Sequence, residues 1–247
     1  MRSLVISDLH ANEEALSAVL RRVETEKIDR LICLGDFVGY GARPNEVVDR
    51  IRSFPAARLC VRGNHDRVAV GRDDGGDFNH AALAAALWTR GVLSDENRKF
   101  LEDLPLGPTE DGDGVMLCHG SPTDEDEYVF TDLEAARIFL EFESRIILFG
   151  HTHLPTIFEL DKEGILYGNL VVGPRTLELE PSCRYLINPG SVGQPRDRNP
   201  LSSFAILDSE AQTIEFGRVP YDISSTQRSI VEAGLPKILA DRLGFGF

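Results

Sequence analysis

The sequence predicts an α/β fold in which two β-sheets pack against each other and helices cover their outer faces. In the first third of the chain, short apolar runs alternate with segments of helical apolar spacing, which indicates a parallel or mixed sheet with helical crossovers. After residue 153, short strands separated by turns predict a second, mostly antiparallel sheet packed on the first. No internal repeat and no long linker interrupts the pattern, so residues 1–247 are expected to form a single domain.

The strands of the first half are expected at five apolar runs, each followed by Asp, His, Asn or Gly. Such runs are typical of buried strands that enter loops. The runs lie at residues 4–6, 31–34, 59–61, 115–118 and 146–149. The later strands are expected at Thr156–Leu160, Ile165–Tyr167, Thr176–Leu179, Tyr185–Ile187, Ser203–Leu207 and Thr213–Val219.

Helices are expected between and after these strands, at places marked by capping residues. Asn12 is a suitable N-cap for the first helix, and Pro44 is typical of the first turn of the second. Further helices are expected from about His80 to Arg90, from Ser94 to Leu104, from a cap at Asp132 through Leu140, and from Ile223 onward, with a polar turn at 107–114.

Composition limits the classes of function. The net charge of −14, from 26 basic and 40 acidic residues, argues against general binding of nucleic acid, because phosphate contacts need clustered Lys and Arg. The cysteines Cys33, Cys60, Cys118 and Cys183 form no closely spaced pair, which favours buried thiols in a reducing compartment. The chain has no signal sequence at its start and no long apolar run, so we expect a cytoplasmic protein without a membrane segment.

Metal-binding side chains follow the expected strands, at the edge where open α/β sheets bind ligands. Asp8 and His10 are two residues apart, and on an extended segment both would point the same way, as would His151 and His153. Asp36 has two oxygens that can bridge two ions. One ion rarely uses seven ligands, so the sequence predicts two ions that share a carboxylate. The seven candidate ligands are Asp8, His10, Asp36, Asn64, His119, His151 and His153.

These residues resemble the calcineurin-like metallophosphoesterase superfamily. Its five motifs are present in order: Asp8-Leu9-His10, Gly35-Asp36, Gly63-Asn64-His65-Asp66, His119-Gly120 and Gly150-His151-Thr152-His153. The stretch at 188–196 also resembles the bacterial and archaeal phosphodiesterase branch. The resemblance implies a four-layer α-β-β-α sandwich of two mixed sheets flanked by helices. It also implies a small helical insert at about residues 67–104 that borders the active site.

The resemblance further implies the ligand sets and the reaction. One metal would be held by Asp8, His10, Asp36 and His153, and the other by Asp36, Asn64, His119 and His151. A hydroxide bridging two divalent ions would attack a phosphodiester or phosphomonoester in line. His65 would be the catalytic residue, protonated, and would stabilise developing charge or protonate the leaving oxygen. Mn²⁺ is the metal that the family favours, and Fe, Co, Ni or Zn also suits these ligands.

Some positions depart from the pattern of the serine/threonine protein phosphatases in this superfamily. Gly39 replaces the Asp that orients the catalytic histidine, and Tyr40 replaces an Arg that grips phosphate. Asp66 either orients His65 instead or is a plain loop carboxylate. Arg196 either binds substrate phosphate, together with Asn64, or is an ordinary surface residue.

The expected partner is a small-molecule phosphoester, and the sequence does not define the oligomeric state. A serine/threonine protein phosphatase and a dinucleoside polyphosphate hydrolase remain alternatives to a phosphodiesterase. A non-catalytic metal-binding scaffold is disfavoured, because His65 and every candidate ligand are present.

Overall fold

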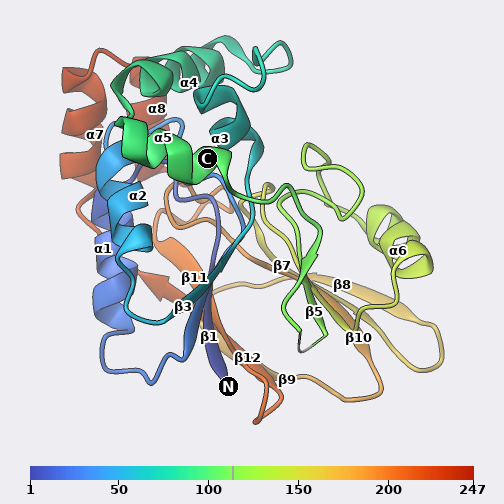
Figure 1. The fold of residues 1–247 in the computed structure, drawn as a ribbon. Helices are drawn as coiled ribbons and strands as arrows, with labels where there is room; N and C mark the ends of the chain where they lie inside the picture. The colour runs from blue at the N-terminus through green and yellow to red at the C-terminus, as the bar shows by residue number, and fades with distance from the viewer. Residues whose placement is uncertain (113) are drawn as a thin grey trace.

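Two β-sheets packed face to face form the centre of the computed structural model, which describes residues 1–112 and 114–247 (Figure 1). One sheet contains β1 (Arg2–Ile6), β2 (Arg30–Cys33), β3 (Ala57–Cys60), β9 (Arg175–Glu178), β11 (Ser202–Asp208) and β12 (Thr213–Val219). The other contains β4 (Thr109–Glu110), β5 (Val115–Leu117), β6 (Ile146–Leu148), β7 (Pro155–Leu160), β8 (Leu166–Leu170) and β10 (Arg184–Pro189). In the described residues the strand orders are β3-β2-β1-β11-β12-β9 and β4-β5-β6-β10-β7-β8.

Each sheet is mixed, and this corrects one expectation. The strands after residue 153 do not form a sheet of their own: β9, β11 and β12 extend the first sheet, whereas β7, β8 and β10 join the second. The strands β1, β2 and β3 are parallel, and β11 adds to β1 in the antiparallel sense. Likewise β10 pairs in parallel with β6 and antiparallel with β7. Both sheets therefore combine early and late strands, a pairing that local sequence patterns do not specify.

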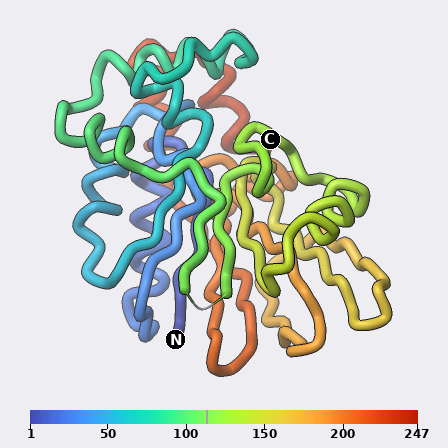
Figure 2. Tube along the Cα trace, turned by 45° about the vertical axis from the view of Figure 1, so that its right-hand side comes forward, coloured from blue at the N-terminus to red at the C-terminus, as the bar shows by residue number. Residues whose placement is uncertain are grey.

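Helices cover the outer faces and the upper end of the sheets in Figure 1. The helices are α1 (Glu13–Arg22), α2 (Pro44–Arg52), α3 (Asn64–Ala69), α4 (His80–Val92), α5 (Asp95–Glu102), α6 (Asp132–Glu141), α7 (Ile223–Glu232) and α8 (Lys237–Asp241), followed by the 3-10 turn η1 (Arg242–Gly244). In Figures 1 and 2, α1 and α2 lie against the first sheet, α6 lies against the second, and α3 and α4 lie at the upper end of the molecule. Helix α7 packs against α1 and α8 at the same end. The predicted sandwich of two mixed sheets flanked by helices is confirmed.

The helix ends agree with the capping residues in the sequence, with one correction. The Asn12 side chain accepts from Ala15 N at 3.1 Å, and Pro44 occupies the first turn of α2. Helix α6 is capped by Thr131 and not by Asp132, because Thr131 and Glu134 form a reciprocal capping box that satisfies two backbone amides. The turn expected at 107–114 contains the short strand β4, and its residue 113 lies outside the described residues.

Successive side chains on the strands point to opposite faces of the sheet and pack into separate apolar layers. On β1, Leu4 and Ile6 pack toward α1 and α2, whereas Val5 lies between the two sheets. A third layer joins the second sheet to α6. The expectation of buried strands fails for β3, an edge strand whose residues are exposed or half-buried. Within the described parts of the chain, no helix has the length and apolar character needed to cross a membrane.

A substitution at Gly217 tests the packing of the first sheet. Gly217 on β12 pairs with Phe204 on β11, and a Cβ atom at Gly217 would lie 2.2 Å from Cζ of the fully buried Phe204 ring. We expect Gly217→Ala to lower the free energy of unfolding by about 1–3 kcal/mol, measured by urea denaturation. Phe204→Leu should relieve the clash. The free energy of unfolding should therefore fall less in the double variant than the sum of its decreases in the two single variants. Additive losses would contradict this account.

Candidate metal centre

Six of the seven candidate ligands lie on loops that follow the strands, and Asn64 is the first residue of α3. Five of the six have left-handed backbone conformations. The φ angles are 54° for Asp8, 46° for His10, 53° for Asp36, 64° for His151 and 60° for His153. Such conformations cost non-glycine residues roughly 1–2 kcal/mol each and concentrate at functional sites. The expectation that the Asp8–His10 and His151–His153 segments are extended is therefore wrong. Tight left-handed turns, and not the alternation of a strand, direct these side chains to one point.

Two groups of buried side chains meet at Asp36. Asp8, His10 and His153 form one group, and Asp36, His119 and His151 form another, with potential ligand atoms of each group within 4.8 Å of one another. Asp36 Oδ2 lies 3.6 Å from His10 Nε2 and 3.5 Å from His119 Nε2, so one oxygen faces both groups. Asp36 Oδ1 accepts from the backbone amide of His65 at 2.9 Å. The carboxylate thus lies between the two groups.

Each of the four histidines directs one ring nitrogen to a backbone carbonyl. Nδ1 of His10, His119 and His153 faces the carbonyl oxygens of Val38, Leu34 and Gln194 at 3.2, 2.7 and 2.5 Å. Nε2 of His151 faces the carbonyl of Asp126 at 3.2 Å. A carbonyl can only accept, so each of these nitrogens carries a proton, and the other nitrogen of each ring faces the centre, where it can bind an ion when it carries no proton.

The ring nitrogens that face the centre are close enough to share ions. His10 Nε2 lies 3.1 Å from His153 Nε2, and His151 Nδ1 lies 3.2 Å from His119 Nε2. Two imidazoles bound to one ion at about 2.0–2.1 Å have nitrogens about 2.8–3.4 Å apart, for ligand angles between a right angle and the tetrahedral angle. Asp8 Oδ1 and Asn64 Oδ1 are also buried, without a hydrogen-bond partner among the described residues. The donor set and these unsatisfied oxygens fit a pair of divalent cations.

Burial and mutual attraction shift the pKa values of this cluster. Burial raises the pKa of Asp8 to about 7, and the Asp36 charge adds to the shift. Burial opposes a charge on His119, but the Asp36 carboxylate outweighs it and raises the pKa of His119 to about 10. The pKa of Asp36 is lowered against burial by His119 and His65. Without metal, His119 therefore holds a proton beside the charged Asp36 at neutral pH.

His65 lies beside the centre and is held by aromatic contacts. Its ring centroid is 4.4 Å from those of Tyr40 and Phe78. Gly39 is required here, because a Cβ atom at this position would lie 2.3 Å from His65 Nδ1. Asp66 does not take the orienting role in this structure, since its oxygens accept from the backbone amides of Val38 and Gly63.

The protonation of His65 differs from the expected charged form. Burial lowers the pKa of His65 to about 4, so the ring is neutral at pH 7 in the protein alone. His65 Nδ1 is buried without a partner among the described residues. Because an orphaned buried N–H is the rarer case in proteins, the ring proton is assigned to Nε2.

The stretch at 188–196 clamps the Asp8 loop to the His153 loop. Ser191 Oγ and Gly193 N both donate to Asp8 O, at 2.8 and 2.9 Å, and Gln194 O is the partner of His153 Nδ1. Gly193 approaches so closely that a Cβ atom would lie 2.0 Å from Leu9 O. This glycine-rich stretch therefore fixes the backbone that presents two candidate ligands from different sheets.

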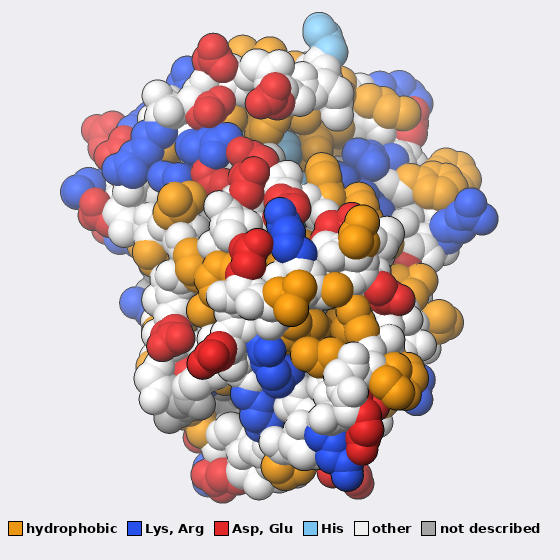
Figure 3. All heavy atoms as spheres, turned by 90° about the vertical axis from the view of Figure 1, so that its right-hand side faces the viewer, with side chains coloured by type: hydrophobic (Ala, Val, Ile, Leu, Met, Phe, Trp, Pro, Cys, Tyr) orange, Lys and Arg blue, Asp and Glu red, His pale blue; other side chains and the backbone are white. Residues whose placement is uncertain are grey.

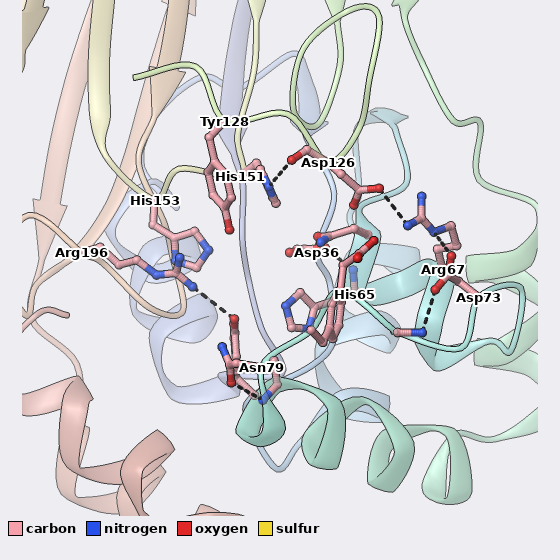
Figure 4. A pocket seen from close by; sticks show the side chains of 16 residues that line it. Asp36, His65, Arg67, Asp73, Asn79, Asp126, Tyr128, His151, His153 and Arg196 are labelled. Atoms are coloured by element: carbon pink, nitrogen blue, oxygen red, sulfur yellow. Dashed lines mark hydrogen bonds and ion pairs between the residues drawn. The ribbon is translucent and has the colours of Figure 1, made fainter. Parts of the chain in front are cut away.

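An open cleft exposes the metal centre to solvent (Figure 4). Its lining includes Arg196, whose guanidinium lies 5.8 Å above the Tyr40 ring and donates to Tyr40 Oη at 3.3 Å. Among the described residues Arg196 has no carboxylate within ion-pair distance. Several lining residues were not singled out individually in the sequence. Arg67, Asp73, Asp77, Phe78 and Asn79 belong to the insert at 67–104 that was expected to border the active site, and Asp126 and Tyr128 come from the loop before α6. These loops contain no metal-binding motif. The signal that could have found them is their position in the sequence, between strands that do carry such motifs.

The chain belongs to the calcineurin-like phosphoesterase superfamily. A family model described as the calcineurin-like phosphoesterase superfamily domain matches residues 1–212. The uncharacterized protein MJ0912 of Methanocaldococcus jannaschii is 41% identical over 246 residues, which cover 98% of this chain and 97% of that protein. Membership implies a metal-dependent phosphoesterase hydrolase, as the motifs predicted.

Solved structures agree with this assignment. A metallophosphoesterase from Sphaerobacter thermophilus is 39% identical and superimposes with a TM-score of 0.88, covering 100% of this chain and 99% of that chain. The hypothetical protein PH1004 from Pyrococcus horikoshii OT3 is 23% identical, with a TM-score of 0.82 and coverage of 100% and 98%, and shows a likeness of fold alone.

Metal binding is expected to release protons over a pH range that the raised pKa of His119 determines. His119 is protonated in the metal-free protein up to about pH 10, and its nitrogen must lose that proton to bind an ion. Affinity for Mn²⁺ should therefore rise with pH from about 7 to 10. Calorimetric titrations at pH 8 in buffers of different ionisation enthalpy should report about one released proton. His119→Asn should remove that release, and a wild-type protein that releases none would contradict the account.

Proposed function

We propose that this chain is a phosphodiesterase that uses two divalent ions. The first would be held by Asp8, His10, Asp36 and His153, and the second by Asp36, Asn64, His119 and His151. The observation that carries the proposal is the buried Asp36 oxygen that lies 3.6 and 3.5 Å from histidine nitrogens of both groups. A carboxylate in this position compensates the charge of ions on both sides, and the four histidines have their tautomers fixed for ligation.

Mn²⁺ is the proposed metal, and Fe, Co, Ni and Zn are compatible. The donor set contains imidazole, carboxylate and amide groups and no thiolate, which suits these ions. When bound, two such ions lower the pKa of water and neutralise phosphate oxygens. The protein contributes the geometry, since Ser191 and Gly193 hold the Asp8 loop and backbone carbonyls hold the histidine rings.

Arg196 and His65 both line the cleft, and both are proposed to act on the substrate. Arg196 carries a charge without an acidic partner among the described residues, and it would bind a phosphate oxygen together with the Asn64 amide. His65 lines the cleft with its proton on Nε2. A neutral imidazole can donate this hydrogen bond to the leaving oxygen, and a bound phosphate would raise the pKa of His65 toward the charged form.

The charges of the cleft favour a diester over more highly charged phosphoesters. Tyr40 stands where the protein phosphatases have an arginine, and Arg67 is occupied by ion pairs with Asp73, Glu125 and Asp126. Arg196 is thus the one lining cation of the described residues that has no acidic partner. A diester carries one negative charge, whereas phosphomonoesters and polyphosphates carry more. This argues against the protein phosphatase and the dinucleoside polyphosphate hydrolase. The intact His65 argues against a scaffold.

The proposed substrate is a small phosphoester, processed in the cytoplasm by one domain in which residues 67–104 form an insert. Residues of this insert, among them Asp73, Phe78 and Asn79, line the cleft. Acidic side chains at its mouth and a net charge of −14 disfavour a nucleic-acid strand as substrate.

The role of His65 can be tested with two leaving groups. The protein is loaded with Mn²⁺, and His65→Asn is assayed on bis-p-nitrophenyl phosphate and on a dinucleoside monophosphate. The alkoxide that leaves the second substrate needs a proton far more than p-nitrophenolate does. We expect kcat on the dinucleoside monophosphate to fall roughly 10²–10⁴-fold, and kcat on the activated diester to fall much less.

The matched control is His80→Asn, the same change at the exposed histidine that begins α4. It should leave both rates and the metal content unchanged. Equal losses on both substrates by His65→Asn, with the metals retained, would show that His65 does not assist the leaving group. Metal-dependent cleavage of p-nitrophenyl phosphate but of neither diester would replace the proposed phosphodiesterase by a phosphatase.

A further inference from the structure

A buried ion-pair network joins the start of α3 to the loop between β5 and α6. Glu125 in this loop is 7% exposed, and its carboxylate pairs with Arg62 at 3.1 Å and with Arg67. Arg62 is also buried. Arg67 lines the cleft and pairs further with Asp126 at 2.9 Å and with Asp73 at 3.3 Å (Figure 4). Loss of one partner would leave a buried charge uncompensated, so the network holds the loop against α3.

The network borders the segments that carry Asn64, His119 and His151, the three ligands that belong only to the second proposed ion. Its two buried or half-buried arginines lie on either side of Asn64 in the sequence. His119 begins the loop that contains Glu125, and this loop folds back tightly, since a Cβ atom at Gly120 would lie 2.6 Å from Glu125 O. A displacement of Glu125 would therefore move the backbone next to His119.

His151 depends on this loop more than the other three histidines do. It alone among the four directs Nδ1 to the centre, and its Nε2 donates to the backbone carbonyl of Asp126 at 3.2 Å. The ring of Tyr128 stacks on that of His151, with centroids 4.0 Å apart. Both supports come from residues that closely follow Glu125, whereas the carbonyls that hold the other three rings belong to other segments.

The first proposed ion has a separate support. Its ligands Asp8 and His153 are held by the stretch at 188–196, and within the described parts of the chain no hydrogen bond or ion pair joins that stretch to the network. We infer that Glu125 is a positioning residue for the second proposed ion alone. This inference rests on the proposed pair of ions, and it divides the metal centre into two halves that separate parts of the protein support.

The variant Glu125→Gln tests the inference, because it keeps the size of the side chain and removes its charge. Binding of Mn²⁺ to the metal-free protein is measured by calorimetric titration. We expect the second ion to bind about 10–100-fold more weakly, as for other losses of a contact that supports a metal ligand, and the first ion to bind as in the wild-type protein. At Mn²⁺ concentrations between the two dissociation constants, electron paramagnetic resonance should show an isolated ion instead of a coupled pair.

A second variant covers the case in which Glu125→Gln does not fold. Arg67→Gln leaves the buried pair of Arg62 and Glu125 in place, and it should weaken the same ion. Figure 3 shows that basic and acidic side chains lie side by side on the face that includes α6, so an ordinary pair is needed as a control. The control is Glu127→Gln, which removes the neighbouring ion pair with Arg137 on α6 and should leave both affinities unchanged.

A third variant separates positioning from a general loss of stability. His119→Asn should already lose the second ion, so adding Glu125→Gln to it should not change the affinity for the remaining ion. Equal weakening of both ions by Glu125→Gln, or unchanged binding of both in Glu125→Gln and Arg67→Gln, would overturn the inference. Titration needs no turnover. Selective loss of one ion in a protein that cleaves no diester would therefore refute the proposed phosphodiesterase and leave this inference standing.

Discussion

The Asp36 carboxylate is the contact on which the rest of the site depends. One of its oxygens faces histidines from both groups, and the other accepts from the His65 backbone amide. The close approach of Gly63 shows how little room surrounds it, since a Cβ atom there would lie 2.1 Å from Asp36 Oδ1. A buried negative charge of this kind is costly unless cations lie beside it. The imidazole nitrogens on either side of Asp36 supply the places where such cations can bind.

Hydrogen bonds from the loop that follows β10 explain why the strained loops around Asp36 are tolerated. Left-handed conformations at Asp8, His10 and His153 would destabilise an isolated loop. Here Ser191 and Gly193 bond to the Asp8 backbone, and Gln194 bonds to the His153 ring. The loop that follows β10 thus connects the first sheet to the second at the metal centre. The mixed sheets also help to build the metal centre, because they bring the carboxyl ends of parallel strands from both halves of the chain to the same side of the molecule.

Local sequence patterns predicted part of this arrangement, and the missing part has physical causes. The ligands were identifiable because each follows an apolar strand, and helix starts such as Asn12 and Pro44 were identifiable because these preferences are local. The division of the late strands between both sheets depends on long-range pairing. The left-handed turns at Asp8 and His151 depend on tertiary contacts. Tyr128 reaches the cleft from a loop whose next residue, Val129, is buried in the apolar layer under α6, a tertiary contact that no local pattern specifies.

The occupancy of the Asp36 site is the most direct test of the account. Crystals of the protein grown with Mn²⁺ would be measured at the manganese absorption edge. We expect two anomalous peaks on either side of the Asp36 carboxylate, roughly 3.5–4 Å apart. One should lie near His10 and His153 and the other near His119 and His151. A single peak, or ions bound away from Asp36, would contradict a shared carboxylate as the organising contact of the site.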